Sequence, residues 1–271
     1  MLSGRDVQEL LDRHGLRPSR ALGQNFVVDP NTVRRIARLA GVGPGDRVVE
    51  IGAGLGSLTL ALAETGASVT AVEIDRYVLP ALKETVEPHG VTVVHDDAMT
   101  LDWGELLGDE PHVLVANLPY NVATPLVADL LDGVPQIQRM LVMVQREVGE
   151  RLAAKVGDDA YGGVSVKVAY WATAKVVGLV PATVFLPQPK VESALVAIER
   201  RPEPAVDAPP DRLFELVRAG FGQRRKMLRR NLAGLVPPEA FEAAGVRPEA
   251  RAEELDVVAW GRLAACAPSP S

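Results

Sequence analysis

The residues with the clearest chemical potential stand in the segment VANLPYNVATPL, which runs from Val115 to Leu126. Asn117, Pro119 and Tyr120 are poor strand formers, yet they directly follow HVLVA, an apolar run typical of a strand buried on both faces. Open α/β sheets bind their ligands at the carboxyl edge of such strands. The segment therefore predicts an amide oxygen, a rigid turn and an aromatic ring that face a ligand at this edge.

A second candidate site is the segment EIGAGLGSLTLAL, which joins a strand end to a glycine-rich turn and a helix start. Gly52, Gly54 and Gly56 allow a tight turn and a close approach of the backbone to a ligand. Glu73 ends the next predicted strand, where a carboxylate can accept both hydroxyls of a ribose. The nicotinamide fingerprint needs a third glycine where this chain has Ser57. The loop therefore favours a nucleoside cofactor over one that carries a pyrophosphate.

Simpler interpretations of these residues stay open at this point. The glycines could form a tight turn without a ligand, Asn117 could cap a loop, and Tyr120 could be a core ring. Asp97 follows the third predicted strand in HDDAM. Its carboxylate suits the exocyclic amine of an adenine, but it could equally be a solvated loop acid.

The elements that must position these residues alternate along the chain. The apolar runs that fit strands are DRVVEI, ASVTAVEI, VTVVH, HVLVAN, QRMLVMVQ, AKVVGLV and SALVAIER. The segments between them that fit helices are ALAETG, YVLPALKETV, TPLVADLLD and EVGERLAAK. This alternation predicts an α/β fold with a doubly wound parallel sheet. The last two strands are joined by the proline-rich loop TVFLPQPKVES, which predicts an antiparallel, hairpin-like addition at one edge.

Proline content marks RPEPAVDAPPD, residues 201–211, as a linker between two domains. We expect the first domain to cover residues 1–203 and a helical second domain to cover residues 204–271. Helices are predicted from about Arg212 and in QRRKMLRRNL, PEAFEAAG and EELDVVAWGRLAA. The tail APSPS is predicted to be disordered.

The composition excludes several classes of protein. Hydrophobic residues make up 47% and charged residues 24% of the 271 residues, a balance typical of globular proteins. No apolar run reaches the roughly 20 residues that span a bilayer. The single cysteine, Cys266, cannot form an internal disulfide, which fits a reducing cytoplasm. Four scattered histidines and one cysteine give no credible zinc-ligand set, so no metal is expected.

The net charge of −6 argues weakly against a general nucleic-acid coat, but the distribution of charge matters more. Both ends of the chain are basic, and local basic patches can bind a polyanion. The segment FGQRRKMLRRNL carries no acid, and we expect it to form one helix whose cations contact phosphates. These cations are Arg224, Arg225, Lys226, Arg229 and Arg230. Weaker candidates near the N-terminus are Arg17, Arg20, Arg34, Arg35 and Arg38.

Nearly the whole chain resembles the S-adenosylmethionine-dependent ribosomal RNA adenine dimethylase family, and most specifically its bacterial members that act on small-subunit (16S) rRNA. The motifs that carry the resemblance occur in the family's order: LGQNFVVDP, EIGAGLGSLTL, VEID, DDAM, NLPYNVATPL, MVQREVGERL, YGGVSV, FLPQPKVESA and FGQRRKMLRR. NLPY together with FLPQPKVES is a specific signature, whereas the glycine loop is generic.

The resemblance implies a Rossmann-like methyltransferase sheet, a small all-helical C-terminal RNA-binding domain, and S-adenosylmethionine as cofactor. The cofactor contacts that it implies, with Gly54 added from the glycine loop, are Asn25, Val27, Gly52, Gly54, Glu73, Asp97 and Asn117. Two positions depart mildly from the family pattern. Val27 stands where many members have leucine, and the loop reads GAGLG where many have GPGLG.

The family's reaction explains the order of groups in NLPY. An adenine N6 amine is a weak nucleophile, so two acceptors must hold its N–H groups and aim its lone pair at the methyl. We expect these to be the Asn117 side-chain oxygen and the Leu118 carbonyl, presented by the turn that Pro119 shapes. Tyr120 would stack on the extruded base. Phe185 resembles the family's second stacking ring, with a core ring as the alternative. No general base is needed.

The sequence therefore predicts dimethylation of adenines in a hairpin loop of small-subunit rRNA, within an immature subunit in the cytoplasm, by a monomer without a membrane partner. The nearest alternative is a large-subunit rRNA adenine methyltransferase that confers antibiotic resistance. A third possibility is an RNA-binding assembly factor with dispensable catalysis. A DNA adenine methyltransferase is disfavoured, since those enzymes tend to carry an aspartate-proline-proline version of the motif.

Overall fold

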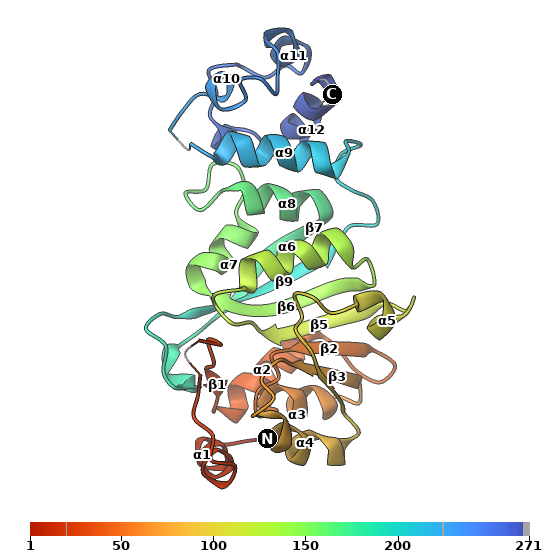
Figure 1. Cartoon of the computed structure of the whole chain (residues 1–271), viewed down its shortest axis with the longest axis vertical. Helices are drawn as coiled ribbons and strands as arrows, with labels where there is room; N and C mark the ends of the chain where they lie inside the picture. The colour runs from red at the N-terminus through yellow and green to blue at the C-terminus, as the bar shows by residue number, and fades with distance from the viewer. Residues whose placement is uncertain (20, 224, 268–271) are drawn as a thin grey trace. The chain divides into compact units, whose positions relative to one another are not determined.

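The computed structural model describes residues 1–19, 21–223 and 225–267. A large sheet forms the centre of the fold (Figure 1). Its strands are β2 (Arg47–Ile51), β3 (Ser68–Glu73), β4 (Thr92–His95), β5 (His112–Asn117), β6 (Ile137–Gln145), β7 (Ala172–Val180) and β9 (Ser193–Arg200). The predicted strand segments all form strands, which confirms the α/β class.

The order of strands across the sheet is β4-β3-β2-β5-β6-β9-β7. The strands from β4 to β6 pair in parallel, and β9 pairs antiparallel with β6. The predicted edge addition is thus present, with β9 and β7 as the last two strands. From β2 the chain continues to β3 and β4 on one side of the sheet, and it then crosses to β5 and β6 on the other side of β2. The carboxyl ends of β2, β3 and β5 therefore lie next to one another. A ligand site is expected at such a switch point.

Helices connect the strands. In the first 160 residues these are α1 (Gly4–Arg13), α2 (Pro30–Ala40), α3 (Ser57–Ala63), α4 (Leu79–Val86), α5 (Trp103–Leu107), α6 (Ala123–Gly133) and α7 (Arg146–Ala153). Helices α2, α3 and α4 bury apolar residues in one cluster with strands of the sheet. Local signals fix the helix ends. Asp29 caps α2 by accepting from the backbone N–H groups of Asn31 and Thr32, and Gly41 ends it in the left-handed conformation.

A second, two-stranded sheet pairs distant parts of the sequence. Strand β1 (Phe26–Val27) runs antiparallel to β8 (Phe185–Leu186), so Phe26 faces Leu186 and Val27 faces Phe185. Both strands are too short to show a hydrophobic period, and the sequence did not predict them. The pairing joins the LGQNF segment to the FLPQPK loop.

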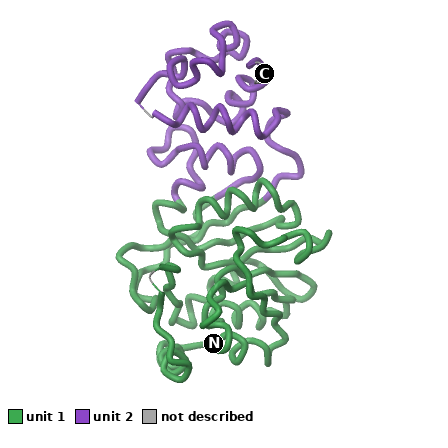
Figure 2. Tube along the Cα trace, in the orientation of Figure 1, with its two compact units in different colours: residues 1–149, 175–199 green, residues 150–174, 200–271 purple. Residues whose placement is uncertain are grey.

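Contacts divide the chain into two compact units, which Figure 2 shows in different colours. The first unit comprises residues 1–149 and 175–199, and the second comprises residues 150–174 and 200–271. This grouping differs from the predicted single boundary between residues 203 and 204. The physical reason is α8 (Gly163–Trp171), whose buried Val166 and Tyr170 belong to the same apolar cluster as the C-terminal helices.

The second unit is helical, as predicted. Its C-terminal helices are α9 (Pro210–Phe221), α10 (Leu228–Asn231), α11 (Pro238–Ala243) and α12 (Val257–Cys266). Trp260 is fully buried within its apolar cluster. Of the predicted disordered tail APSPS, Ala267 is buried in the apolar cluster of the second unit, which differs from the prediction, and residues 268–271 lie outside the described residues.

The prediction of one basic helix through FGQRRKMLRRNL is wrong. Helix α9 ends at Phe221, and α10 begins only at Leu228. Gly222 is a weak helix former. The Asn231 side chain also donates to the backbone carbonyls of Gly220 and Gln223. These carbonyls at the end of α9 therefore have hydrogen-bond partners although the helix does not continue. Arg225 and Lys226 therefore stand in the connection between the two helices, and Arg229 and Arg230 stand in the short helix α10.

Among the described residues, none of the helices combines the length and the apolar character that crossing a bilayer requires.

Candidate active site

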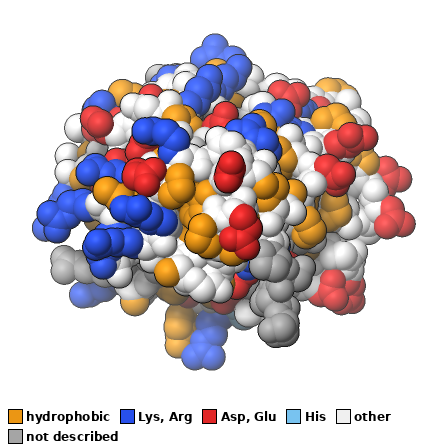
Figure 3. All heavy atoms as spheres, turned by 90° about the horizontal axis from the view of Figure 1, so that it is seen from above, with side chains coloured by type: hydrophobic (Ala, Val, Ile, Leu, Met, Phe, Trp, Pro, Cys, Tyr) orange, Lys and Arg blue, Asp and Glu red, His pale blue; other side chains and the backbone are white. Residues whose placement is uncertain are grey.

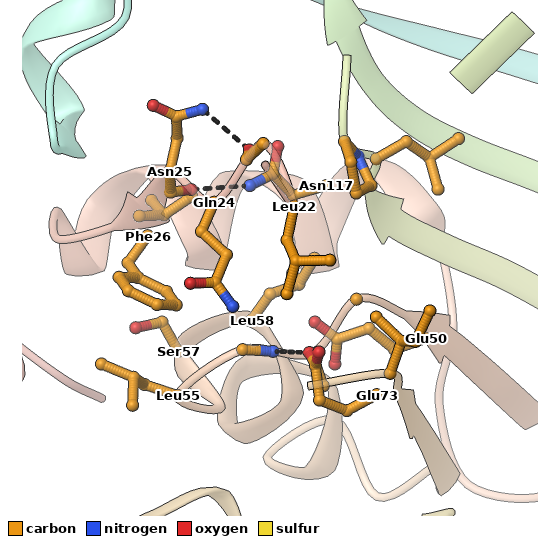
Figure 4. A pocket seen from close by; sticks show the side chains of 18 of the residues that line it. Leu22, Gln24, Asn25, Phe26, Glu50, Leu55, Ser57, Leu58, Glu73 and Asn117 are labelled. Atoms are coloured by element: carbon orange, nitrogen blue, oxygen red, sulfur yellow. Dashed lines mark hydrogen bonds between the residues drawn. The ribbon is translucent and has the colours of Figure 1, made fainter. Parts of the chain in front are cut away.

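A pocket lies at the carboxyl edge of the sheet, where the sequence predicted a ligand (Figure 4). Three strands contribute polar side chains to it: Glu50 from β2, Glu73 from β3 and Asn117 from β5. In Figure 4 the two glutamates lie beside each other, and Asn117 and Asn25 lie across the pocket from them. The N-terminal segment 22–27, the glycine loop with the start of α3, and residues 118–120 supply most of the remaining wall.

The glycine loop between β2 and α3 lies against the pocket with Gly52, Gly54 and Gly56 at φ values of 71°, 58° and 87°. Side chains rarely tolerate this left-handed region. Gly54 is also sterically required, because a Cβ there would lie 2.9 Å from the ring of Phe26. The loop thus brings bare backbone to the pocket, as the motif predicted.

The carboxylate of Glu73 is fixed by the backbone around it. Its Oε2 accepts from the Gly54 N–H at 2.7 Å, and its Oε1 accepts from the Asp75 N–H at 2.9 Å. Burial raises the pKa of Glu73, which is 4% exposed, and these two hydrogen bonds oppose the rise. Each carboxylate oxygen can accept a further hydrogen bond, so the side chain can still hold hydroxyls of a ligand.

The Asn117 amide is oriented by the N-terminal segment. Its Nδ2 donates to the backbone carbonyl of Asn25 at 3.0 Å, a bond drawn as a dashed line in Figure 4. This bond leaves Oδ1 of Asn117 as the acceptor. Among the described residues no backbone N–H donates to the Leu118 carbonyl, whereas the Pro119 carbonyl accepts from Val122 and Ala123 at the start of α6. The two predicted acceptors are therefore both available.

Tyr120 also lines the pocket, and its hydroxyl makes a 2.9 Å hydrogen bond with the Ser193 hydroxyl. Ser193 is fully buried at the start of β9. Burial raises the pKa of Tyr120, and the Ser193 bond opposes the rise. The bond connects the two signature motifs, NLPY and FLPQPKVES. The sequence did not single out Ser193, although it is the final serine of the second motif.

The N-terminal segment lies across the pocket and is held there from both sides. Gln24 accepts from the Ser19 N–H and donates to Asp75 Oδ2, at 2.8 Å each. Beyond it, Val27 is buried in the pairing with β8. Asn25 and Val27 thus line the pocket as the family resemblance implied, with Leu22 and Gln24 beside them.

Asp97 lies in an adjoining pocket, not in the one that Glu73 lines. The two pockets share Leu22, Gly52, Ile74 and Pro119 as wall residues. Oδ1 of Asp97 accepts from the Met99 N–H at 2.9 Å. The two pockets together can hold a long ligand, with one end at Asp97 and the other at Asn117 and Glu50.

Phe185 does not line either pocket. Its side chain is 3% exposed and packs in the apolar cluster that also contains Val27. The position of Phe185 thus differs from that expected of a second stacking ring, because the pairing of β8 with β1 places its side chain in the core. An aromatic residue in a proline-rich loop carries no local signal that distinguishes these two positions.

Sequence reasoning missed Glu50. This carboxyl stands between the apolar Val49 and Ile51 near the end of β2, is 2% exposed, and lines the pocket beside Glu73. Burial raises its pKa to about 8, although the Thr59 hydroxyl opposes the rise and the charge of Glu73 adds to it. An acid at a buried position of a strand was the available signal.

The predicted RNA-binding cations lie in the second unit. Arg225, Lys226, Arg229 and Arg230 are exposed, and Arg224 lies outside the described residues. Arg229 pairs with Glu249 at 3.3 Å, with both side chains about half exposed. Figure 3 shows basic side chains gathered toward one side of the face that it views, with acidic side chains among them, and mainly acidic side chains on the other side. An exposed ion pair of this kind contributes little to stability, so Arg229 remains available to a phosphate.

Of the weaker N-terminal candidates, Arg35 donates to the Leu179 carbonyl, and Arg20 lies outside the described residues.

The donor set identifies the kind of ligand. Within the described ranges no group of His, Cys, Asp and Glu could hold a metal ion. The pocket instead offers carboxylates, an amide and bare glycine backbone, and one oxygen of Glu50 is buried without a hydrogen-bond partner. These groups fit a ligand with hydroxyls and a positive charge, as S-adenosylmethionine has.

Comparison with known proteins gives a consistent result. The model of the family described as ribosomal RNA adenine dimethylase matches residues 16–267. A ribosomal RNA small subunit methyltransferase A from Kineococcus radiotolerans is 50% identical, with 99% of this chain and 92% of the relative covered. The protein of that name from Thermobifida fusca is 47% identical, with coverages of 97% and 95%.

Solved structures share the fold. The crystal structure of the 23S rRNA methyltransferase ErmE matches with a TM-score of 0.70 and 28% identity, covering 89% of this chain and 99% of that one. A dimethyladenosine transferase from Plasmodium falciparum matches with a TM-score of 0.73 and 24% identity, covering 87% and 94%.

Proposed function

Because the chain belongs to the ribosomal RNA adenine dimethylase family, we propose that it transfers methyl groups from S-adenosylmethionine to the N6 amines of adenines in a hairpin loop of small-subunit rRNA. The product is dimethyladenosine, made during ribosome biogenesis. The curated relatives at 47–50% identity match this chain over nearly their whole length. Their name is that of a small-subunit rRNA methyltransferase, which supports this substrate class.

The two adjoining pockets hold the cofactor. The Glu73 carboxylate accepts from the ribose hydroxyls, and Asp97 accepts from the adenine amine in the neighbouring pocket. The glycine loop and the N-terminal segment enclose the amino-acid end, through Asn25, Val27, Gly52 and Gly54. S-adenosylmethionine supplies an electrophilic methyl group when it is bound.

The observation that carries the proposal is the fixed amide of Asn117. One N–H of its amide donates to the Asn25 carbonyl, which leaves its oxygen to accept from a ligand in the pocket. Asn117 Oδ1 and the Leu118 carbonyl hold the two N–H groups of the target amine and expose its lone pair. Pro119 shapes the turn, and the Tyr120 ring supports the extruded base, a contact worth about 1–3 kcal/mol. Phe185 supports strand β1 from the core.

The exposed cations of the second unit bind the phosphates of the rRNA. We propose that the RNA is presented within an immature small subunit in the cytoplasm. We propose a monomer as the active form.

A large-subunit rRNA substrate is the second candidate. The structural match to the 23S rRNA methyltransferase ErmE is the observation that favours it. The identity there is 28%, against 50% for a small-subunit relative, and the small-subunit substrate is therefore preferred.

Labelled S-adenosylmethionine with unmethylated small or large ribosomal subunits tests the proposal. We expect label in the small subunit alone, recovered as dimethyladenosine at mapped adenines, and far slower labelling with Asn117→Ala. Label confined to the large subunit would favour the second candidate. Binding of the small subunit without transfer would favour an assembly factor that does not need catalysis.

A further inference from the structure

Helix α1 lines neither cofactor pocket, but it packs on the elements that hold the glycine loop. It precedes residue 16, where the match to the family model begins. Its apolar residues Val7 and Leu11 are 0% and 4% exposed and stand one turn apart on one face of the helix. They belong to one apolar cluster with the ring of Phe26 and with Leu55 of the glycine loop. The helix and the loop therefore share a core.

The ring of Phe26 connects this cluster to the backbone of the loop. A Cβ at Gly54 would lie 2.9 and 3.0 Å from two atoms of the ring, so the ring packs directly on bare backbone. Figure 4 shows Phe26 and Leu55 on the same side of the pocket. The Gly54 N–H donates to Glu73 Oε2 at 2.7 Å. The position of the Phe26 ring thus limits how far this N–H can move from the carboxylate that it orients.

Helix α4 packs on the loop at its other end. A Cβ at Gly56 would lie 2.5 Å from Cγ1 of Val86, which is in the last turn of α4. Helix α1 is tied to α4 as well, because Arg13 forms an ion pair with Glu84 of α4, and the adjacent His14 Nε2 lies 2.8 Å from Glu84 Oε2. Helix α1 is thus attached both to strand β1 and to α4, the two elements that pack on the glycine backbone.

We propose that α1 is a positioning element of the cofactor site, which holds Phe26 and α4 against the glycine loop and so raises the affinity for the cofactor. The inference rests on the proposed function, because it takes S-adenosylmethionine as the ligand. When α1 leaves its place, the loop samples shapes in which the Gly54 N–H and the Glu73 carboxylate are no longer joined. Only the ordered fraction of molecules binds, so the apparent affinity falls with that fraction. Bound cofactor orders the loop again, so the rate of methyl transfer at saturation does not depend on α1.

Leu11→Ala loosens α1 and changes no residue that lines a pocket. Calorimetry should show that its affinity for S-adenosylhomocysteine is roughly tenfold lower. Single-turnover transfer at saturating S-adenosylmethionine should stay within about twofold of the wild-type rate. Leu131→Ala removes the same atoms from a buried position on α6 that lines neither pocket, and it is the matched control. It should bind S-adenosylhomocysteine as the wild-type protein does.

Glu84→Arg loosens the same helix without opening a cavity in the core. It places a cation beside Arg13 and His14, on a side chain that is 43% exposed. We expect affinity for S-adenosylhomocysteine to fall roughly twofold to fivefold, and by less at high salt, because salt screens the repulsion. Glu87→Arg makes the same change of charge at an exposed position just after α4 and should bind as the wild-type protein does.

Hydrogen exchange measures the coupling from the opposite direction. If α1 raises the affinity for the cofactor, the bound cofactor must stabilise the docked α1 by the same factor. Saturating S-adenosylhomocysteine should therefore slow the exchange of the wild-type amides of residues 7–11 by up to about tenfold, although these residues line neither pocket. In Leu11→Ala without ligand, the amides of the glycine loop should exchange faster than in the wild-type protein.

Unchanged exchange of residues 7–11 on binding would overturn the inference, and so would unchanged affinity in Leu11→Ala. An equal loss of affinity in Leu131→Ala would overturn it as well, because stability alone would then set the affinity. If Leu11→Ala does not fold, unchanged affinity in Glu84→Arg decides against the inference. Absence of any binding of S-adenosylmethionine or S-adenosylhomocysteine to the wild-type protein would instead overturn the proposed function.

Discussion

The pocket at the sheet edge and the basic segment 225–230 use polar side chains in opposite ways. In the pocket, Glu73 is 4% exposed with both oxygens bonded to backbone N–H groups, and the Asn117 amide is fixed by Asn25. In the basic segment the cations are exposed, and the one ion pair described there, Arg229 with Glu249, is 3.3 Å long and about half exposed.

This difference determines what each region can select. A fixed and buried acceptor distinguishes ligands by the position of single atoms, because moving or removing it leaves partners unsatisfied. Exposed cations act through their charge. Salt screens this attraction, and it depends little on the position of any single cation. We therefore expect single substitutions to have large effects in the pocket and graded, salt-dependent effects in the basic segment.

The largest effect is expected for Asn117→Ala. Loss of the fixed acceptor should lower the rate of methyl transfer by on the order of 10²–10³. Single-turnover transfer at saturating cofactor and RNA measures the rate apart from binding. Asn31→Ala, an exposed asparagine on α2, serves as the control and should leave the rate unchanged. A near-wild-type rate for Asn117→Ala would remove this residue from the chemistry.

Glu73→Gln should have the next largest effect, on binding instead of rate. The substituted amide places N–H donors against those of Gly54 or Asp75 and loses the charge that favours the ribose hydroxyls. We expect affinity for S-adenosylmethionine to fall roughly tenfold to a hundredfold. Calorimetry on a variant whose melting is cooperative gives the value. Unchanged affinity would show that the ribose lies elsewhere.

The same contrast explains what the sequence could predict. The strands of the large sheet follow from apolar runs of the right length, and β2, β3 and β5 bring Gly52, Glu73 and Asn117 together because parallel strands end at one edge. These are consequences of local pattern and of topology. The family motifs then indicated the N-terminal segment, which the structure places across the pocket.

What the sequence did not predict depends on non-local contacts. The pairing of β1 with β8 places the Phe185 side chain in the core, although its neighbours in sequence do not indicate this position. Glu50 looks like part of an apolar strand until its burial beside Glu73 is known. The basic segment fits a helix by composition, but Asn231 bonds the end of α9 and ends the helix there.

A charge-reversal pair tests the basic segment. Arg225→Glu with Arg229→Glu should weaken binding to the small subunit about tenfold near physiological salt. It should also reduce the slope of log affinity against log salt by about 0.9 for each phosphate that the variant no longer neutralises. Filter binding across a salt series gives both numbers. Cofactor affinity should not change, because the segment contributes no residue to either cofactor pocket.

Arg218→Glu with Arg262→Glu makes the same change in net charge on α9 and α12 and should leave the salt slope near that of wild type. If both pairs shift the slope equally, the RNA senses only the net charge of the unit. If neither does, the cations of residues 225–230 serve solubility, and the RNA surface lies elsewhere.

The smallest effect is expected where the pocket depends on one hydrogen bond between side chains. Tyr120→Phe and Ser193→Ala each remove the 2.9 Å bond between the two hydroxyls and keep the aromatic ring. A neutral hydrogen bond contributes about 1 kcal/mol, so each variant should lose roughly fivefold in transfer at low RNA concentration. The double variant should lose little more than either single one, because both substitutions remove the same hydrogen bond.

Tyr120→Ala, which also removes the aromatic face on which the base stacks, should lose more. If the two single losses multiply in the double variant, the hydroxyls act independently. Tyr120 would then be positioned by its ring alone, through packing of the kind that holds Phe185.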